Sequence, residues 1–416
     1  MNDCIPTKIK KLMDRGVDIR NPLMVDIDDD VVLERISGDD VVFYGQVRIS
    51  GTDTTLCSGS RLGEEGPVTL INCRLGRNVR LKGGSFRKSL FLDRAEFGPG
   101  AHVREGCLIE EEAGGAHTVG LKQTILFPFV TLGSLINFCD CFMAGGTSRK
   151  DHSEVGSSYI HFNYTPNQDK ATASLIGDVP RGVMLRERPI FLGGQGGLVG
   201  PSRIGYGAVV AAGIILREDV EEGRLVRAER PRDPATRDFL RGWYGEPRRI
   251  LTNNIMYIAN LVALKAWYRH CRKPFFEATE RGTMLYRGAL EILEAALDER
   301  LKRLGGLAQN MSRPIETSVD IPGNDSPEAA ELRKIFSENW PALEDCICSF
   351  DADDETSEKR DAFLERFQAE HAAAGSLDYL DVIRSLDDTT VALGTAWLQE
   401  MVDRLVFVAG SVIWLS

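Results

Sequence analysis

The chain has 416 residues, of which 43% are hydrophobic and 27% charged, and its formal net charge is -11 at pH 7. This length exceeds the usual size of a single domain, so we expect two domains. The acidic balance offers no basic field for nucleic acid or for an anionic membrane, and no segment has about 18 uncharged apolar residues in a row. We therefore expect a soluble, cytoplasmic protein with small-molecule or protein partners.

The first 35 residues are charged and lack a regular hydrophobic period, apart from a short helical pattern at Lys8 to Arg15. They contain no uninterrupted apolar run and no cleavage pattern of small residues that would mark a targeting segment. We expect residues 1–35 to form an N-terminal cap over the domain that follows.

From Ile36 onward an apolar residue recurs every sixth position, in pieces at first and then without interruption near residues 190–216. The apolar residues of that stretch are Leu192, Leu198, Ile204, Val210 and Leu216. Most of them are followed by Gly or Ala. A period of six is typical of a hexapeptide β-helix, in which short strands stack into a prism and each aliphatic side chain points inward. The alternative is a Gly-rich loop with coincidental aliphatic residues. We predict a parallel β-helix over residues 36–232, with loops leaving the prism where the period breaks, at 114–118 and 145–154.

The period is lost after Leu216, and from Pro234 the sequence becomes poor in Gly. Apolar residues then recur at helical spacing in five segments: 251–273, 284–304, 328–349, 355–373 and 387–415. Ser326 and Pro327 are suited to the N-cap and the first position of the third helix. We expect residues 233–416 to form an all-α C-terminal domain.

The nine cysteines are odd in number and scattered, with two CxC pairs at Cys139/Cys141 and Cys346/Cys348. A CxC pair in a strand directs both thiols to one face, which is one arrangement of a metal or redox site, but no second pair of Cys or His residues stands nearby to complete four ligands. We expect reduced, mostly buried thiols and no metal site.

Residues 148–172 form the window that is densest in groups able to bind a charged ligand or move a proton. The candidates are Arg149, Lys150, His152, His161, Asn163, Tyr164 and Lys170. His152 is the better general base toward an amine, and Asn163 can donate a hydrogen bond to a developing oxyanion. The cations can hold a phosphate or carboxylate. The alternative is a polar surface loop whose Asn and Tyr side chains cap strand ends.

Three runs carry a resemblance to a known family: NFCDCF (137–142), HFNYTPNQDKAT (161–172) and the stretch 191–220. They resemble the acetyltransferase half of the bifunctional bacterial glucosamine-1-phosphate acetyltransferase/N-acetylglucosamine-1-phosphate uridyltransferase. The resemblance implies a left-handed parallel β-helix, a homotrimer, and transfer of an acetyl group from acetyl-CoA to the amine of an amino-sugar phosphate between adjacent prisms.

The resemblance also implies site residues. Its Asn-Tyr motif and Lys-bearing loop fall on Asn163, Tyr164 and Lys170, and its catalytic His corresponds to His152. Its acetyl-CoA contacts fall on Gly194, Ala212, Gly213 and, for the distal phosphate, Arg227 or Arg230.

The chain departs from the family at the positions that hold the sugar phosphate. Phe142 and Met143 stand where the family has Lys, and Thr131 and Gly133 stand where it has Arg. Each lost charge-assisted contact weakens binding by about 1.5–3 kcal/mol, although Arg149 and Lys150 can compensate. The Ser expected near Gly194 is also absent, and no Gly-rich nucleotidyltransferase loop opens the chain.

Three hypotheses follow for function. The first is a CoA-dependent N-acyltransferase that acts on an amino sugar or sugar phosphate. The second is a β-helix that binds a sugar nucleotide without turnover. The third is a trimeric scaffold whose helical domain recruits a partner.

Overall fold

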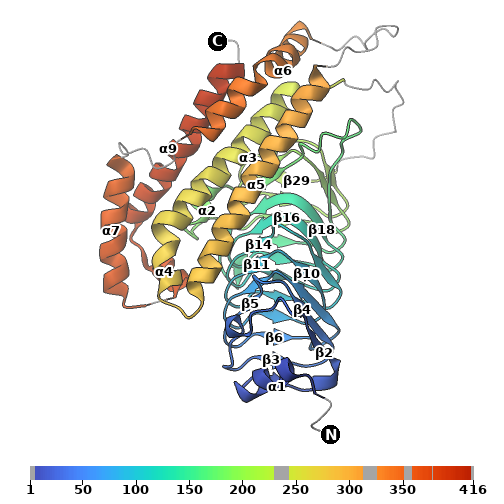
Figure 1. Ribbon diagram of the computed structural model, residues 1–416. Helices are drawn as coiled ribbons and strands as arrows, with labels where there is room; N and C mark the ends of the chain where they lie inside the picture. Colours follow the sequence, from blue (N-terminus) through green and yellow to red (C-terminus); the bar gives the residue numbers. More distant parts are fainter. Residues whose placement is uncertain (1–4, 229–242, 313–325, 351–357, 377, 414–416) are drawn as a thin grey trace.

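The computed structural model describes residues 5–228, 243–312, 326–350, 358–376 and 378–413. An N-terminal helix, α1 (Thr7–Asp14), lies across one end of a long β-solenoid, and a layer of helices packs along the side of that solenoid (Figure 1). Short 3-10 turns at Pro22–Met24 and Leu33–Arg35 belong to the first coil.

The solenoid is a triangular prism of parallel strands, and each coil places one short strand on each of three faces. Face 1 is the 11-stranded sheet: β1 (Asp18–Ile19), β3 (Val42–Phe43), β6 (Arg61–Leu62), β9 (Arg80–Leu81), β12 (Glu96–Phe97), β15 (Gly114–Gly115), β17 (Thr131–Leu132), β21 (Glu154–Val155), β24 (Phe191–Leu192), β27 (Val209–Val210) and β29 (Leu225–Val226). Face 2 holds β2 (Val25–Ile27), β4 (Val47–Ser50), β7 (Val68–Ile71), β10 (Gly84–Arg87), β13 (Ala101–Val103), β22 (Ile160–Phe162), β25 (Gly197–Val199) and β28 (Ile215–Leu216). Face 3 holds β5 (Thr55–Leu56), β8 (Arg74–Leu75), β11 (Leu90–Phe91), β14 (Leu108–Ile109), β23 (Ser174–Ile176) and β26 (Arg203–Ile204). The long strands β16 (Gly120–Leu126) and β18 (Asn137–Met143) turn from face 2 into face 3 and join them in one sheet.

The period-six aliphatic residues form the core of the prism. Leu192, Leu198, Ile204, Val210 and Leu216 are all buried. Because a strand of two or three residues places one side chain inward and its neighbour outward, one aliphatic per face fills the interior. The predicted parallel β-helix is confirmed as a parallel β-solenoid, and its left-handed coiling remains an implication of the resemblance. Pairing already begins at Asp18, inside the segment expected to be a cap.

Three segments leave the prism at its edges. An antiparallel hairpin of β19 (Gly146–Ser148) and β20 (Asp151–His152) leaves the edge between faces 3 and 1, as the break at 145–154 predicted. A loop at 163–173 leaves the edge between faces 2 and 3, and the segment 177–190, with helix α2 (Val179–Gly182), leaves the edge between faces 3 and 1. The prediction of a loop at 114–118 is wrong, because Gly114–Gly115 pairs in face 1 with β12 and β17. The glycine at 114 is required by close packing of the coils, since a Cβ there would lie 2.0 Å from the Glu96 carbonyl oxygen.

The C-terminal part is all helical, as predicted. Its helices are α3 (Pro247–Trp267), a π-helical turn (Tyr268–Arg272), α4 (Lys273–Glu277), α5 (Gly282–Met311), α6 (Pro327–Cys348), α7 (Glu358–Ala374), α8 (Tyr379–Ser385) and α9 (Asp388–Ile413). The predicted N-cap is confirmed, because the Ser326 hydroxyl accepts a hydrogen bond from the Ala329 amide at 3.1 Å. Within the described ranges, none of these helices combines the length and the apolar character needed to cross a bilayer.

The helices cover face 3 of the solenoid. The outward side chains of that face form a ladder that includes Leu90, Leu108 and Phe142, and all three are buried. Helices α3 and α5 run along this face, with α7 and α9 farther from the prism in Figure 1. An ion pair of 2.8 Å between Arg74 on β8 and Glu291 on α5 spans the contact. Face 3 is therefore a buried interface within one chain.

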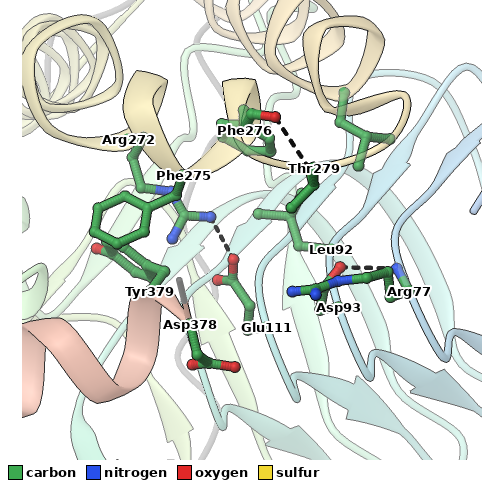
Figure 2. Close-up of a pocket in the computed structure, with 11 residues that line it drawn as sticks. Arg77, Leu92, Asp93, Glu111, Arg272, Phe275, Phe276, Thr279, Asp378 and Tyr379 are labelled. Atoms are coloured by element: carbon green, nitrogen blue, oxygen red, sulfur yellow. Dashed lines mark hydrogen bonds and ion pairs between the residues drawn. The ribbon is translucent and has the colours of Figure 1, made fainter. Parts of the chain in front are cut away.

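Buried charges mark the same contact at the edge between faces 3 and 1. Figure 2 shows Arg272 directed toward Glu111, with which it forms an ion pair of 2.5 Å, and beside the ring of Tyr379. The Tyr268 hydroxyl donates to Glu110 at 2.6 Å. Burial raises the pKa of Glu110 to about 7, against the opposing charge of Arg272.

Candidate functional site

The hairpin β19–β20 carries the first group of candidate residues. Arg149, at its tip, folds back over face 1: Nη1 donates to the carbonyl oxygens of Glu112 (3.0 Å) and Phe129 (3.1 Å) and to the Thr131 hydroxyl (3.0 Å). The Arg149 guanidinium therefore lies beside Thr131, a position at which the family has Arg. It borders a surface hollow of about 440 Å³ whose lining includes Gly114 and Gly115. Lys150 is exposed beside it.

His152 is half-buried at the end of the hairpin. Its Nδ1 atom is enclosed and has no hydrogen-bond partner among the described residues. The neighbouring Asp151 carboxylate accepts from the Thr147 hydroxyl at 3.0 Å. A general base is usually oriented by a group that binds its second ring nitrogen, and within the described chain His152 has no such group.

The loop 163–173 carries the second group. The Asn163 side chain donates from Nδ2 to Asp140 Oδ2 at 3.2 Å, and its Oδ1 accepts from the Thr172 hydroxyl at 2.9 Å. Tyr164 and Lys170 are exposed on the same loop.

A hollow of about 360 Å³ adjoins this loop. Its lining combines loop residues such as Tyr164 and Thr172 with residues that follow the solenoid, such as Tyr244 and Leu307. The helical part of the chain therefore contributes to the surroundings of the loop.

His161 lies inside the wall of the solenoid, under the same loop. It is 4% exposed, and its Nε2 is 2.8 Å from the Ser174 hydroxyl. Burial lowers its pKa to about 4, so the ring is neutral at pH 7. The structure thus puts His161 behind the loop, whereas Asn163, which strand alternation places on the same side, lies at the surface beyond the strand end.

The third group follows the strands of face 1 at the edge between faces 1 and 2. Gly194 and Gly213 stack in successive coils, where the Gly213 amide donates to the Gly194 carbonyl at 2.9 Å. A Cβ at Gly194 would lie 2.6 Å from the Ser157 carbonyl oxygen, which explains the glycine. Ala212 and Arg227 are exposed along this edge, and Arg230 lies outside the described residues.

The three groups therefore occupy three different edges of one prism. The hairpin with Arg149 and His152 leaves the edge between faces 3 and 1, the Asn163 loop leaves the edge between faces 2 and 3, and Gly194 lies between faces 1 and 2. Face 3, which separates His152 from Asn163, is covered by helices. A single prism does not bring these groups together.

Two residues next to Asn163 were not predicted from the sequence. Asp140 has a left-handed backbone conformation (φ 59°) at the point where β18 turns from face 2 into face 3. Its carboxylate forms an ion pair of 2.5 Å with Nη2 of Arg300 on α5. The available signal was a charged residue inside the apolar run FCDCF, since a carboxylate is seldom buried without a partner. No local pattern pointed to Arg300.

The eight described cysteines are unpaired, and no three His, Cys, Asp or Glu side chains in this part of the chain are grouped as metal ligands would be. Burial raises the pKa of Cys107 to about 12 and that of Cys73 to about 11, so these thiols are protonated at pH 7.

Fold and edge loops together define a β-solenoid protein of the hexapeptide-repeat class. No family model matches the sequence. The chain is similar to the bifunctional protein GlmU of Thermotoga maritima, with 29% identity over 217 residues that cover 51% of this chain and 42% of that protein. The GlmU proteins of Pelobacter propionicus (28% over 224 residues; 53% of this chain, 43% of that protein) and Acaryochloris marina (28% over 248; 58% and 48%) are similar to a comparable extent. The resemblance seen in the motifs is thus confirmed over about half of the chain, and the match spans less than half of each relative.

Proposed function

We propose that this protein is a CoA-dependent N-acyltransferase that transfers an acetyl group from acetyl-CoA to an amino sugar or sugar phosphate. The observation that carries the proposal is the similarity to bifunctional GlmU proteins, together with a β-solenoid that presents the Asn163–Tyr164 loop at an edge. The acetyltransferase half of that family uses acetyl-CoA on this architecture.

In the proposed reaction the amine of the acceptor attacks the thioester carbonyl, and His152 takes the proton that the amine loses. One Nδ2 hydrogen of Asn163 is bonded to Asp140, which leaves the other for the oxyanion of the tetrahedral intermediate. The intermediate expels CoA as the thiol, which takes up the proton from His152. Arg149, beside Thr131, supplies the cation for an acceptor phosphate.

A homotrimer is part of this proposal, because the site residues occupy three edges. Faces 1 and 2 both carry exposed apolar side chains on their last coils: Phe191, Val209 and Leu225 on face 1, and Ile160 and Ile215 on face 2. Packing face 1 of one copy on face 2 of the next is a heterologous contact, which closes into a ring when the rotation allows it. Threefold packing of triangular prisms would bring a hairpin, an Asn163 loop and a Gly194 edge close together.

The alternative is a protein on the same fold that binds a sugar nucleotide, or acts as a scaffold, without turnover. The observation that favours it is Phe142, which stands where the family has Lys and is buried under helices. No cation can approach a ligand from that position.

Melting temperatures with acetyl-CoA, CoA, UDP-N-acetylglucosamine and glucosamine 1-phosphate test the proposal first. A ligand at 100 times its Kd adds about 2.7 kcal/mol, which raises the melting temperature by a few degrees. We expect a shift with acetyl-CoA, followed by acceptor-dependent release of CoA thiol that His152→Ala abolishes and Asn163→Ala strongly reduces. A shift with the sugar nucleotide alone, or with no ligand, would favour the alternative.

A further inference from the structure

The Asn163 amide has a single favourable orientation in this structure. Nδ2 donates to Asp140 on β18, and Oδ1 accepts from Thr172 at the far end of the loop. Rotating the amide by 180° would place its oxygen against the Asp140 carboxylate and its NH2 group against the Thr172 hydroxyl. Two facing acceptors repel, so the Asp140 carboxylate determines that the NH2 end of the amide faces β18 and that the oxygen end faces Thr172.

Asp140 is itself held by the helical part of the chain. Arg300, on α5, donates from Nη2 to Asp140 Oδ1 at 2.5 Å, and the two side chains are 3% and 12% exposed. A carboxylate enclosed to this degree stays ionised only when a cation or several donors accompany it. The Arg300 guanidinium therefore holds one oxygen of the Asp140 carboxylate and fixes the orientation of the other oxygen, which faces Asn163.

The helical part also binds the loop along its length. The Tyr244 hydroxyl donates to Asp169 at 2.8 Å, Asn310 Nδ2 donates to the Asn167 carbonyl at 2.8 Å, and Asn254 Nδ2 donates to the Ala171 carbonyl at 3.0 Å. These contacts hold the loop by one side chain and two backbone carbonyls, whereas Arg300 acts on the Asn163 side chain through Asp140.

We infer that Arg300 is a positioning residue for Asn163, and that helix α5 thereby belongs to the framework of the acyl-transfer site. The inference rests on the proposed function for the role of Asn163, whereas the geometry of the amide can be measured without turnover. It assigns to the helical part a task beyond covering face 3.

The experiment compares Arg300→Met, Arg300→Lys and the control Arg74→Met in the full-length protein. Arg74 is matched to Arg300, since it also joins face 3 to α5 through an ion pair, with Glu291 at 2.8 Å, but it lies on β8, five coils from β22. The first readout is the side-chain amide NMR signal of Asn163 in protein labelled with 15N-asparagine, identified by its loss in Asn163→Asp. The second is kcat and KM for acetyl transfer.

We expect Arg300→Met to move or broaden the Asn163 amide signal and to lower kcat by about tenfold to a hundredfold, as a small displacement of a reacting group does. KM for acetyl-CoA should stay within about twofold, because no CoA contact is lost. Arg300→Lys, which keeps the charge, should restore part of kcat, and Arg74→Met should change neither readout.

An unmoved Asn163 signal in folded Arg300→Met would overturn the inference, as would an equal loss of kcat in Arg74→Met. If Arg300→Met does not fold, Arg300→Lys and Asp140→Asn provide the same comparison, because both leave the interface filled. Wild-type protein without turnover would instead contradict the proposed function, and the NMR signal would still decide whether Arg300 orients Asn163.

Discussion

Arg149 places its guanidinium beside Thr131, where the resembled family has its own Arg. If Arg149 holds the acceptor phosphate, Arg149→Ala should raise KM for a phosphorylated acceptor by about tenfold to a hundredfold, the equivalent of one charge-assisted contact. KM for the corresponding amino sugar without phosphate should not change, and this pair of acceptors is the internal control. An equal increase for both acceptors would place Arg149 in a structural role.

The raised pKa of the Glu110 carboxyl makes the free energy of unfolding depend on pH. Its pKa rises to about 7 through burial, and Arg272, Glu111 and Tyr268 face it. Between pH 4.5 and about 7 the folded protein holds a proton that the unfolded chain, with a Glu pKa of 4.5, has released. The free energy of unfolding should therefore fall as pH rises through this window, by on the order of 1–3 kcal/mol, and level off above it.

Urea midpoints of wild type and Glu110→Gln between pH 5 and 8 measure this effect. Gln keeps the hydrogen bond from Tyr268 and has no proton to lose, so its profile should be flatter. The pKa of Glu111 is also raised, mainly by burial, so some pH dependence should persist in Glu110→Gln. Identical slopes in the two proteins would contradict the assignment to Glu110.

At the scale of elements, face 3 has become a helix-packing surface. Phe142, where the family has Lys, is 1% exposed and packs edge to face on Phe127 with ring centroids 4.7 Å apart. The substitution is therefore explained by the helices that cover the face, since a Lys there would be buried without a partner.

Phe142→Lys, which restores the family residue, should destabilise the fold by several kcal/mol, because it combines a lost aromatic side chain with a buried charge. Phe142→Leu is the control and should cost less, since an aliphatic side chain fills part of the space. Chemical denaturation measures both. A stable Phe142→Lys protein with higher activity would show that this face is open to ligand.

At the scale of the whole molecule, the separation of His152 and Asn163 by face 3 predicts sites shared between copies. Alone, His152→Ala should be inactive and Asn163→Ala should keep only a small part of wild-type activity. In trimers that contain both variants, one of the three interfaces combines an intact His152 with an intact Asn163 from the neighbouring copy, so about a third of wild-type activity should return. Co-expression of two differently tagged variants, purified on both tags, provides the sample. No recovery in verified mixed oligomers would place each site within one chain.

Much of the architecture could be predicted from the sequence, because its causes are local and repeated. One inward side chain per face requires an aliphatic every sixth residue, and this pattern gave the solenoid. The helical spacing of apolar residues predicted five of the helices, and Ser326 as an N-cap predicted where α6 begins. The short helix α8 was missed, since seven residues carry too little periodicity to be recognised. The sequence predicts a loop at Gly114, but the glycine is there because a side chain would clash with the Glu96 carbonyl oxygen of the previous coil. That contact exists only once the coils are stacked.

The tertiary structure alone decided where the chemistry-bearing side chains meet. The sequence by itself determined the solenoid, the helices and the dense window at 148–172, since composition and period act over a few residues. Arg300 and Asp140 are 160 residues apart, and an Arg in an amphipathic helix looks like any solvated charge until the helix is placed against a face. That placement depends on the apolar ladder of face 3, whose members lie one coil apart and show their common side only when the coils are stacked. The sequence thus specified the prism, and the packing of helices on one of its faces decided which edges remain open to ligand.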